Sequence, residues 1–357
     1  MSTKSSTDDN KSASALRTAL RSFKARDLPP VTKVIDLDSS MVTLEAAKCL
    51  WEHNILGAPV WDGTKMAYVG FFDMRDILSA FVACAKSVQR DDESNGENGG
   101  DDGDKASGKG APLLSSYNTL MAKELTQFGK ERGLGDLATI SYLAARNHFH
   151  SCRLDATLEE LCQILVTNHC HRVPIINGDS TGRCKGIVSQ SALVKFLSKN
   201  VSQEDLSETL EEAGLDYRRR VISVLDSTPA GDAFGVLDSH RLSGIAVVDQ
   251  SGKLVGNTSA RDIKLAALDG GHTAMDEDII SYLASVRQAE VIKISRYPSC
   301  HVHEYGCTVG RVVNLLAKTG YHRVFVVDED LMPVGVVSVS DILAFAIGAG
   351  GDVGEKD

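Results

Sequence analysis

Four segments of this 357-residue sequence share the same order of predicted elements. Each has an apolar helical stretch, two short β-rich stretches joined by a turn, a polar triplet and a second helix. The segments span residues 42–82, 156–197, 230–268 and 303–346. A unit with one small sheet and two helices cannot bury its sheet alone, so such units should pair. The repeats predict an α/β chain of α+β-type units in two tandem pairs.

The second β-rich stretch contains a glycine in every repeat and runs into a polar motif. In the fourth repeat this motif is Ser338-x-x-Asp341. Ser at a helix N-cap with an acid at the third helical position is close to a capping box, and a cap alone explains any single copy. The glycines are Gly70, Gly186, Gly256 and Gly335, and the corresponding motif residues are Asp73 and Asp76, Ser189 and Ala192, Ser259 and Asp262, and Ser338 and Asp341.

The same motif also suits a nucleotide. A carboxylate at a helix start can accept hydrogen bonds from both ribose hydroxyls, so Asp341, Asp262 and Asp76 are the candidate ribose ligands. Free N–H groups and a hydroxyl at the helix start suit a phosphate. The candidate hydroxyl ligands are Ser338, Ser340, Ser259 and Ser189.

A phosphate also needs cations, and a repeated His-Arg pair can supply them. His171-Arg172 and His322-Arg323 stand at the start of the first β-rich stretch in repeats 2 and 4. An Arg beside an apolar strand can instead pair with a surface acid, and that alternative stays open for each pair taken singly. An adenine would need an apolar slot, for which 245–247 and 324–326 are candidates, although both fit core strands better.

Composition excludes several classes of function. The net charge of -10 argues against nucleic-acid binding, and no apolar run approaches the length of a membrane span or signal sequence. Eight cysteines without a C-x-x-C pair indicate reduced thiols, as expected of a soluble intracellular protein. No P-loop, G-x-S-x-G or kinase motif is present, so we expect no enzyme activity. Cys300, His301, His303 and Cys307 fit no standard zinc spacing, so no metal is expected.

Composition also sets the expected boundaries. Residues 1 to about 14 look unstructured, and Leu16, Leu20 and Phe23 share one face of a short helix that should dock on the fold. The expected segments are a tail with this helix at 1–28, repeats at 29–88, 147–200, 217–270 and 289–349, an acidic glycine-rich loop at 89–112, linkers at 113–146, 201–216 and 271–288, and a tail at 350–357.

The four repeats resemble the CBS domain (cystathionine β-synthase-type repeat). Together they resemble the γ regulatory subunit of the AMP-activated and Snf1-type protein kinases, from about residue 23 to 347 apart from the acidic loop. The resemblance is carried by "GAPVWD" in repeat 1, "HRVPII" in repeat 2, and "HRVFVVDED" and "GVVSVSDIL" in repeat 4. In that family, repeats 1, 3 and 4 typically hold the aspartate while repeat 2 lacks it, as here.

The resemblance implies a noncatalytic subunit that binds AMP, ADP or ATP competitively near the centre of a disk. The implied partners are a catalytic α subunit and a β scaffold subunit. The implied location is the cytoplasm and also the nucleus. His171, Arg172, His322 and Arg323 would face the shared cavity and touch phosphates. This chain departs from the family at Asp73, which replaces the hydroxyl, and at Leu56 and Ser191, which replace an Arg and a Lys. Full sites are therefore expected at Asp262 and Asp341.

Two other interpretations remain at this point. A constitutive scaffold of the same fold could have lost nucleotide binding, as the two missing cations suggest. A CBS-type regulator could instead serve an enzyme or transporter unrelated to kinases, with a different adenosyl ligand. Two observations would distinguish these interpretations: nucleotide that co-purifies with the chain, and capture of kinase subunits.

Overall fold

The computed structural model describes residues 10–29, 34–83, 139–176, 182–263, 275–290 and 300–349. The predicted acidic loop, the tail at 350–357 and most of the linker at 113–146 lie outside these ranges. None of the described helices is long and apolar enough to cross a membrane.

Four three-stranded sheets have the same construction. A short first strand pairs in parallel with the central strand, which forms an antiparallel hairpin with the third. The short first strands precede the segments 42–82, 156–197 and 230–268, and the fourth, β10, overlaps the segment 303–346 only at His303. The sheets are β1 (Leu37–Asp38), β2 (Gly57–Asp62) and β3 (Ala67–Asp73); β4 (Cys152–Arg153), β5 (Arg172–Ile176) and β6 (Cys184–Ser189); β7 (Ser223–Leu225), β8 (Gly244–Val248) and β9 (Leu254–Ser259); and β10 (His301–His303), β11 (Arg323–Val327) and β12 (Pro333–Ser338).

Helices flank each hairpin as the periodicity predicts. One helix precedes the central strand in each repeat, and its apolar face packs on the sheet. These helices are α2 (Thr43–Glu52), α7 (Leu158–Thr167), α9 (Ala230–Ser239) and α12 (Val309–Thr319). The elements after the third strand are a helix described over 74–83, α8 (Gln190–Asn200), the 3-10 turn η3 (Ala260–Ile263) and α13 (Val339–Ile347). The remaining elements are α1 (Lys11–Ser22), η1 (Ala25–Asp27), α6 (Ile140–Ala145) and α11 (Ile279–Glu290).

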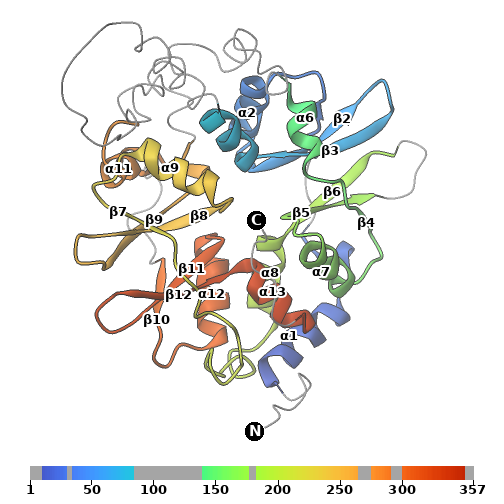
Figure 1. Cartoon of the computed structure of the whole chain (residues 1–357). Coiled ribbons are helices and arrows are strands. Elements are labelled where there is room, and N and C mark those ends of the chain that lie inside the picture. Colours follow the sequence, from blue (N-terminus) through green and yellow to red (C-terminus); the bar gives the residue numbers. More distant parts are fainter. Residues whose placement is uncertain are drawn as a thin grey trace, which may run out of the picture.

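The four units surround a common centre, in the order repeat 1, repeat 2, repeat 4, repeat 3 (Figure 1). Two large hydrophobic cores join them. One core combines residues of repeats 1 and 3, such as Leu78 and Phe234, and the other combines repeats 2 and 4, such as Leu197 and Leu343. Each tandem pair therefore contributes one unit to each core.

Helix α1 belongs to the second core. Leu16 and Leu20 are fully buried against α7, α8 and α13, and the ring of Phe23 packs edge-on against Phe196 at 4.9 Å. The helix begins at Lys11, earlier than the composition predicts, because the Asn10 side chain caps it by accepting from the N–H of Ala13.

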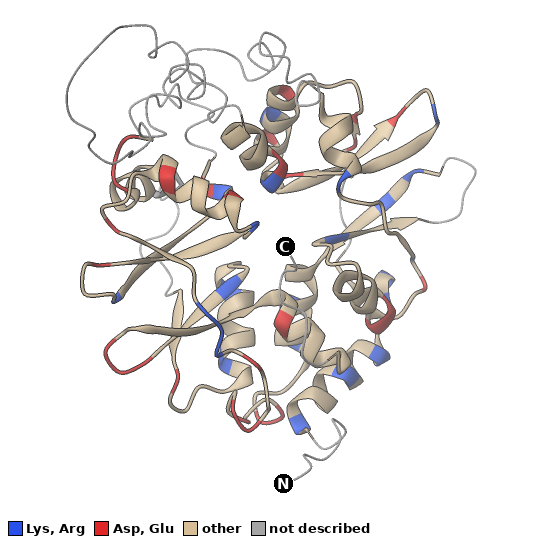
Figure 2. Cartoon of the chain, viewed as in Figure 1, with Lys and Arg blue, Asp and Glu red and all other residues tan. Residues whose placement is uncertain are grey.

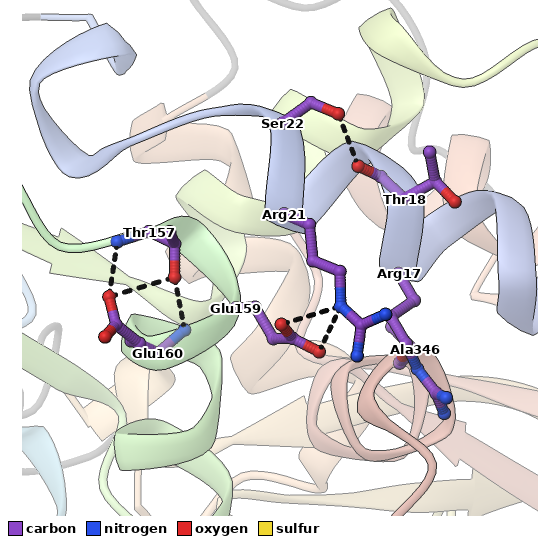
Figure 3. A network of polar contacts seen from close by, with 8 residues as sticks. All are labelled: Arg17, Thr18, Arg21, Ser22, Thr157, Glu159, Glu160 and Ala346. Atoms are coloured by element: carbon purple, nitrogen blue, oxygen red, sulfur yellow. Dashed lines mark hydrogen bonds and ion pairs between the residues drawn. The ribbon is translucent and has the colours of Figure 1, made fainter.

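Polar contacts fix α1 at its solvent side (Figure 3). The guanidinium of Arg21 donates to both carboxylate oxygens of Glu159 on α7, at 2.9 and 3.0 Å. Arg17 donates to the carbonyl of Ala346 on α13 at 3.3 Å. The helix therefore connects the N-terminal part of the chain to the last repeat.

Candidate functional site

The hairpin register brings the two sequence motifs together. In every repeat, the first residue of the central strand pairs with the last residue of the third strand, where the polar motif begins. The pairs are Gly57 with Asp73, Arg172 with Ser189, Gly244 with Ser259, and Arg323 with Ser338. In repeats 2 and 4, the His-Arg pair and the cap therefore lie at the same end of the hairpin. Lys and Arg segments are visible around the centre of the ring (Figure 2).

Arg172 and Arg323 each reach the neighbouring repeat of their tandem pair. A Cβ placed on Gly57 would lie 3.1 Å from Nη1 of Arg172, and one placed on Gly244 would lie 3.4 Å from Nε of Arg323. Arg323 also donates to the hydroxyl of Ser243. Both arginines thus lie where two repeats meet, as a shared anion site requires.

The two histidines of these pairs also meet. The ring centroids of His171 and His322 are 6.2 Å apart, and Nδ1 of His171 is 3.9 Å from a carboxylate oxygen of Asp73. Burial, followed by the nearby positive groups of His171, Arg172, Arg323 and Arg261, lowers the pKa of His322 to about 3. Burial disfavours charge of either sign, but the neighbouring positive groups disfavour only a further positive charge, and they would attract an anion.

A cavity of about 230 Å³ opens between repeats 3 and 4. Arginine side chains supply positive charge to it, while aliphatic and aromatic side chains supply apolar wall. Such a combination suits a ligand with an apolar ring and a charged group. The lining residues are Arg219, Arg220, Val221, Ile222, Leu242, Gly244, Arg323, Phe325, Val336 and Ser338.

Asp341 is not among the lining residues, but it contacts two of them, Ser338 and Arg219. Its Oδ2 accepts hydrogen bonds from the backbone N–H of Ser338 at 2.6 Å and from the Ser338 hydroxyl at 2.7 Å, while its own N–H donates to that hydroxyl oxygen at 3.2 Å. The capping box is therefore present. Nη2 of Arg219 donates to the same Oδ2, so the carboxylate is also part of an ion pair.

The site of repeat 1 is filled by the protein itself. Asn147 donates from Nδ2 to Oδ2 of Asp76 at 2.8 Å and to the carbonyl of Phe71 at 3.0 Å. The ring of Phe149 stacks on Tyr68, with centroids 4.4 Å apart. A ribose at Asp76 would have to displace this asparagine.

The two acids of repeat 1 also differ in the direction of their pKa shifts. Burial, reinforced by the charge of Asp73, raises the pKa of Asp76 well above its ordinary value. Burial acts in the same direction on Asp73, but the hydrogen bond and charge of His171, with the charge of Arg172, lower the pKa of Asp73 overall. The anion of this pair is thus Asp73, which also caps its helix by accepting from the N–H of Arg75 at 2.8 Å.

The remaining predicted residues act mainly as caps or bridges. Oδ2 of Asp262 accepts from the N–H and hydroxyl of Ser259 at 2.7 and 3.0 Å, at the start of η3. The Ser189 hydroxyl accepts from the N–H of Ala192 at 3.2 Å. Ser340 lies beside the cap of α13, where its hydroxyl donates to the side-chain oxygen of Gln190 at 3.1 Å and links α13 to α8.

Sequence reasoning missed Arg219 and Arg220. They stand in "YRRRV", just before β7 and outside the repeat pattern, so the motif search did not reach them. Three consecutive arginines in a chain of net charge -10 were the available signal. No group of three or more His, Cys, Asp or Glu side chains in the described ranges is placed to hold a metal ion.

Comparison with known proteins agrees with this architecture. The CBS domain family model matches residues 140–199, 213–269 and 301–348, which correspond to repeats 2, 3 and 4. Repeat 1 lies outside these matches but has the same sheet order. A solved structure from Methanocaldococcus jannaschii, proposed as an archaeal homologue of the AMP-activated kinase γ subunit, covers 88% of this chain and 97% of its own, with 17% identity and a TM-score of 0.57.

Curated relatives point in the same direction. The γ-3 subunit of 5'-AMP-activated protein kinase from Bos taurus is 24% identical over 87% of this chain, and the subunit from Homo sapiens is also 24% identical over 87%. The chain spans about half the length of these relatives, 55% and 56% respectively. The chain therefore contains CBS domains in repeats 2, 3 and 4, and a first unit with the same sheet order completes the two tandem pairs; the chain resembles the γ regulatory subunits of AMP-activated protein kinase.

Proposed function

We propose that this chain is a noncatalytic regulatory subunit that binds AMP, ADP or ATP between repeats 3 and 4. Nucleotide occupancy would regulate a protein kinase of the AMP-activated or Snf1 type, which supplies a catalytic α subunit and a β scaffold subunit. The observation that carries the proposal is a cavity that combines arginines with an apolar wall, one of whose arginines, Arg219, forms an ion pair with the carboxylate of Asp341.

Three sets of residues at the cavity would contact the ribose, the phosphate and the adenine of a nucleotide. Asp341 would accept hydrogen bonds from the ribose hydroxyls, and Arg323 with the hydroxyl of Ser338 would bind phosphate oxygens. The apolar side chains of Ile222 and Phe325 would contact the adenine ring. A nucleotide regulates a partner only if it binds two states of the protein with different affinity, so occupancy would have to alter the kinase-facing surface.

Replacing Asp341 tests the nucleotide site. Asp341→Ala is expected to weaken AMP binding roughly tenfold to hundredfold, because a charge-assisted hydrogen bond contributes about 1.5–3 kcal/mol. Isothermal titration calorimetry of the purified chain with AMP, ADP and ATP measures this change.

A matched control separates ribose binding from capping. Thr157 and Glu160 form the same capping box at α7, on the solvent side shown in Figure 3. Glu160→Ala removes a comparable cap and should leave nucleotide affinity unchanged. Equal affinity of the Asp341→Ala protein and the wild type would reject this site.

Reconstitution tests the kinase partnership. The chain should capture the α and β subunits from a mixture of purified proteins, and AMP and ATP should change the activity of the complex in opposite directions. Lack of capture would favour a regulator of another enzyme or a transporter. Capture without any response of kinase activity to nucleotide would contradict the regulatory part of the proposal.

A scaffold without nucleotide binding is the second candidate. The observation in its favour is that Asn147 contacts Asp76 and Arg219 contacts Asp341, so two of the three candidate ribose carboxylates already accept from a side chain more than 70 positions away in the sequence. A scaffold should purify without nucleotide and still assemble with its partners. Mass spectrometry of small molecules released from the denatured protein decides between the two.

A further inference from the structure

We propose that Arg219 determines which nucleosides the site between repeats 3 and 4 accepts. In the absence of ligand it acts as an internal counter-ion on Asp341, and on binding it transfers to a phosphate of the ligand. The site would then take phosphorylated nucleosides in preference to adenosine. This inference rests on the proposed function and names the ligand class of the same site.

The contacts of Arg219 place it on the atom that a ribose would need. Its Nη2 donates to Oδ2 of Asp341 and to the carbonyl of Val336, the latter at 3.2 Å. The side chain of Asp341 is only 10% exposed, so a ligand cannot approach this oxygen from open solvent while the arginine covers it. Ribose binding at Asp341 therefore requires Arg219 to move.

Arg219 is also incompletely satisfied where it lies. Its Nε is buried and has no hydrogen-bond partner among the described residues. A buried donor without an acceptor is unfavourable, and Arg220 and Arg323 line the same cavity with like charge. A phosphate would give Nε an acceptor and would offset all three charges, so it favours the displaced arrangement.

Repeat 1 shows how this arrangement differs from a permanent closure. Asn147 makes the corresponding pair of contacts there, to Asp76 and to the carbonyl of Phe71. Phe71 stands two residues before its motif residue Asp73, as Val336 stands two before Ser338. The asparagine is short and neutral, so a phosphate gives no electrostatic gain that would offset the loss of its two hydrogen bonds. Only the charged residue makes closure depend on the charge of the ligand.

The energetic consequence differs between two closely related ligands. Adenosine must displace Arg219 and leaves the guanidinium without a counter-ion, so the closed population lowers its apparent affinity. AMP displaces the same side chain but provides the new counter-ion. The ratio of AMP affinity to adenosine affinity therefore measures what Arg219 does.

The test is calorimetric titration of the full chain with AMP and with adenosine. In Arg219→Ala and Arg219→Gln proteins, adenosine should bind about tenfold more tightly than in the wild type. AMP should gain less or lose affinity, so the ratio of AMP affinity to adenosine affinity falls. Arg218→Ala is the matched control, because Arg218 is 58% exposed and pairs with Glu304 at 2.8 Å; it should keep the wild-type ratio.

The outcomes separate this inference from the proposed function. An unchanged ratio in both Arg219 variants overturns the role of Arg219, even where Asp341→Ala abolishes AMP binding and so supports the nucleotide site. Adenosine binding by the variants alone, with none by the wild type, supports the inference. Failure of every protein to bind either ligand overturns both. Thermal denaturation of each variant confirms that the binding data come from folded protein.

Discussion

His322 illustrates what a local motif can and cannot predict at the scale of one residue. The family resemblance implied that it would face a shared central cavity, and its ring lies 6.2 Å from that of His171 of another repeat. The lowered pKa could not be predicted, because it depends first on burial and then on positive groups of other repeats, His171, Arg172 and Arg261 among them. The capping box of Ser338 and Asp341 could be read directly, since it lies within four residues.

The lowered pKa of His322 predicts a pH dependence of stability. In the unfolded chain this histidine takes up a proton near pH 6.5, whereas in the folded chain it does so only near pH 3. The unfolded state therefore binds more protons between these values, so stability is full above pH 6.5 and is lost as the pH falls. The expected slope below pH 6.5 is about 1.4 kcal/mol per pH unit from this group.

Urea unfolding between about pH 7.5 and about pH 5.5 measures this slope. His322→Gln should flatten it, because the replacement cannot take up a proton. His53→Gln, at an exposed histidine of α2's C-terminus, should behave as the wild type. The same slope in His322→Gln and wild type would show that other groups cause the pH dependence.

At the scale of elements, two of the four repeated strand glycines, Gly70 and Gly335, have a reason that the sequence did not reveal. A Cβ on Gly335 would lie 2.2 Å from the carbonyl oxygen of Tyr217, and one on Gly70 would lie 2.0 Å from that of Ala144. The segment before the first strand of one repeat crosses the hairpin of its tandem partner at the glycine. The pattern showed that glycine recurs, but the crossing joins positions more than 70 residues apart.

Gly335→Ala should therefore destabilise the protein by about 1–3 kcal/mol or more, because backbone must move to admit the methyl group. It should also weaken AMP binding, since Tyr217 lies two residues before Arg219. Gly63→Ala, in an exposed hairpin where no described atom lies within 4 Å of the added Cβ, is the matched control. Urea unfolding measures the stability, and calorimetry measures the AMP affinity. Equal stability of the two variants would contradict the close contact between Gly335 and the backbone of Tyr217.

At the scale of the whole molecule, the repeats predicted four units in two tandem pairs, but not which units share a core. The apolar faces of the helices are alike in composition, so nothing in them specifies a partner. The structure pairs repeat 1 with repeat 3 and repeat 2 with repeat 4. Every tandem pair is thus anchored in both cores, and the two pairs should unfold together.

Two tryptophans make that cooperativity measurable. Trp51 and Trp61 are the only tryptophans of the sequence, and both lie in repeat 1. Leu343→Ala removes a fully buried side chain from the other core and should cost about 2–5 kcal/mol. It should lower the unfolding midpoint seen by tryptophan fluorescence as much as the midpoint seen by far-ultraviolet circular dichroism.

Leu154→Ala, at a position 39% exposed, should leave both midpoints unchanged. If the fluorescence midpoint of Leu343→Ala stays at the wild-type value while the dichroism midpoint falls, the two cores unfold independently and the expected cooperativity is wrong.

The contact between α1 and α13 has a consequence for synthesis of the chain. Arg17 and Ala346 are 329 positions apart, so a ribosome adding about 5–20 residues per second takes roughly 16 to 66 seconds to pass from one to the other. Helix α7 emerges first and offers Leu16 and Leu20 a partial cover. The apolar face that awaits α13 stays open until translation reaches the last repeat, which makes it a natural binding site for chaperones on the nascent chain.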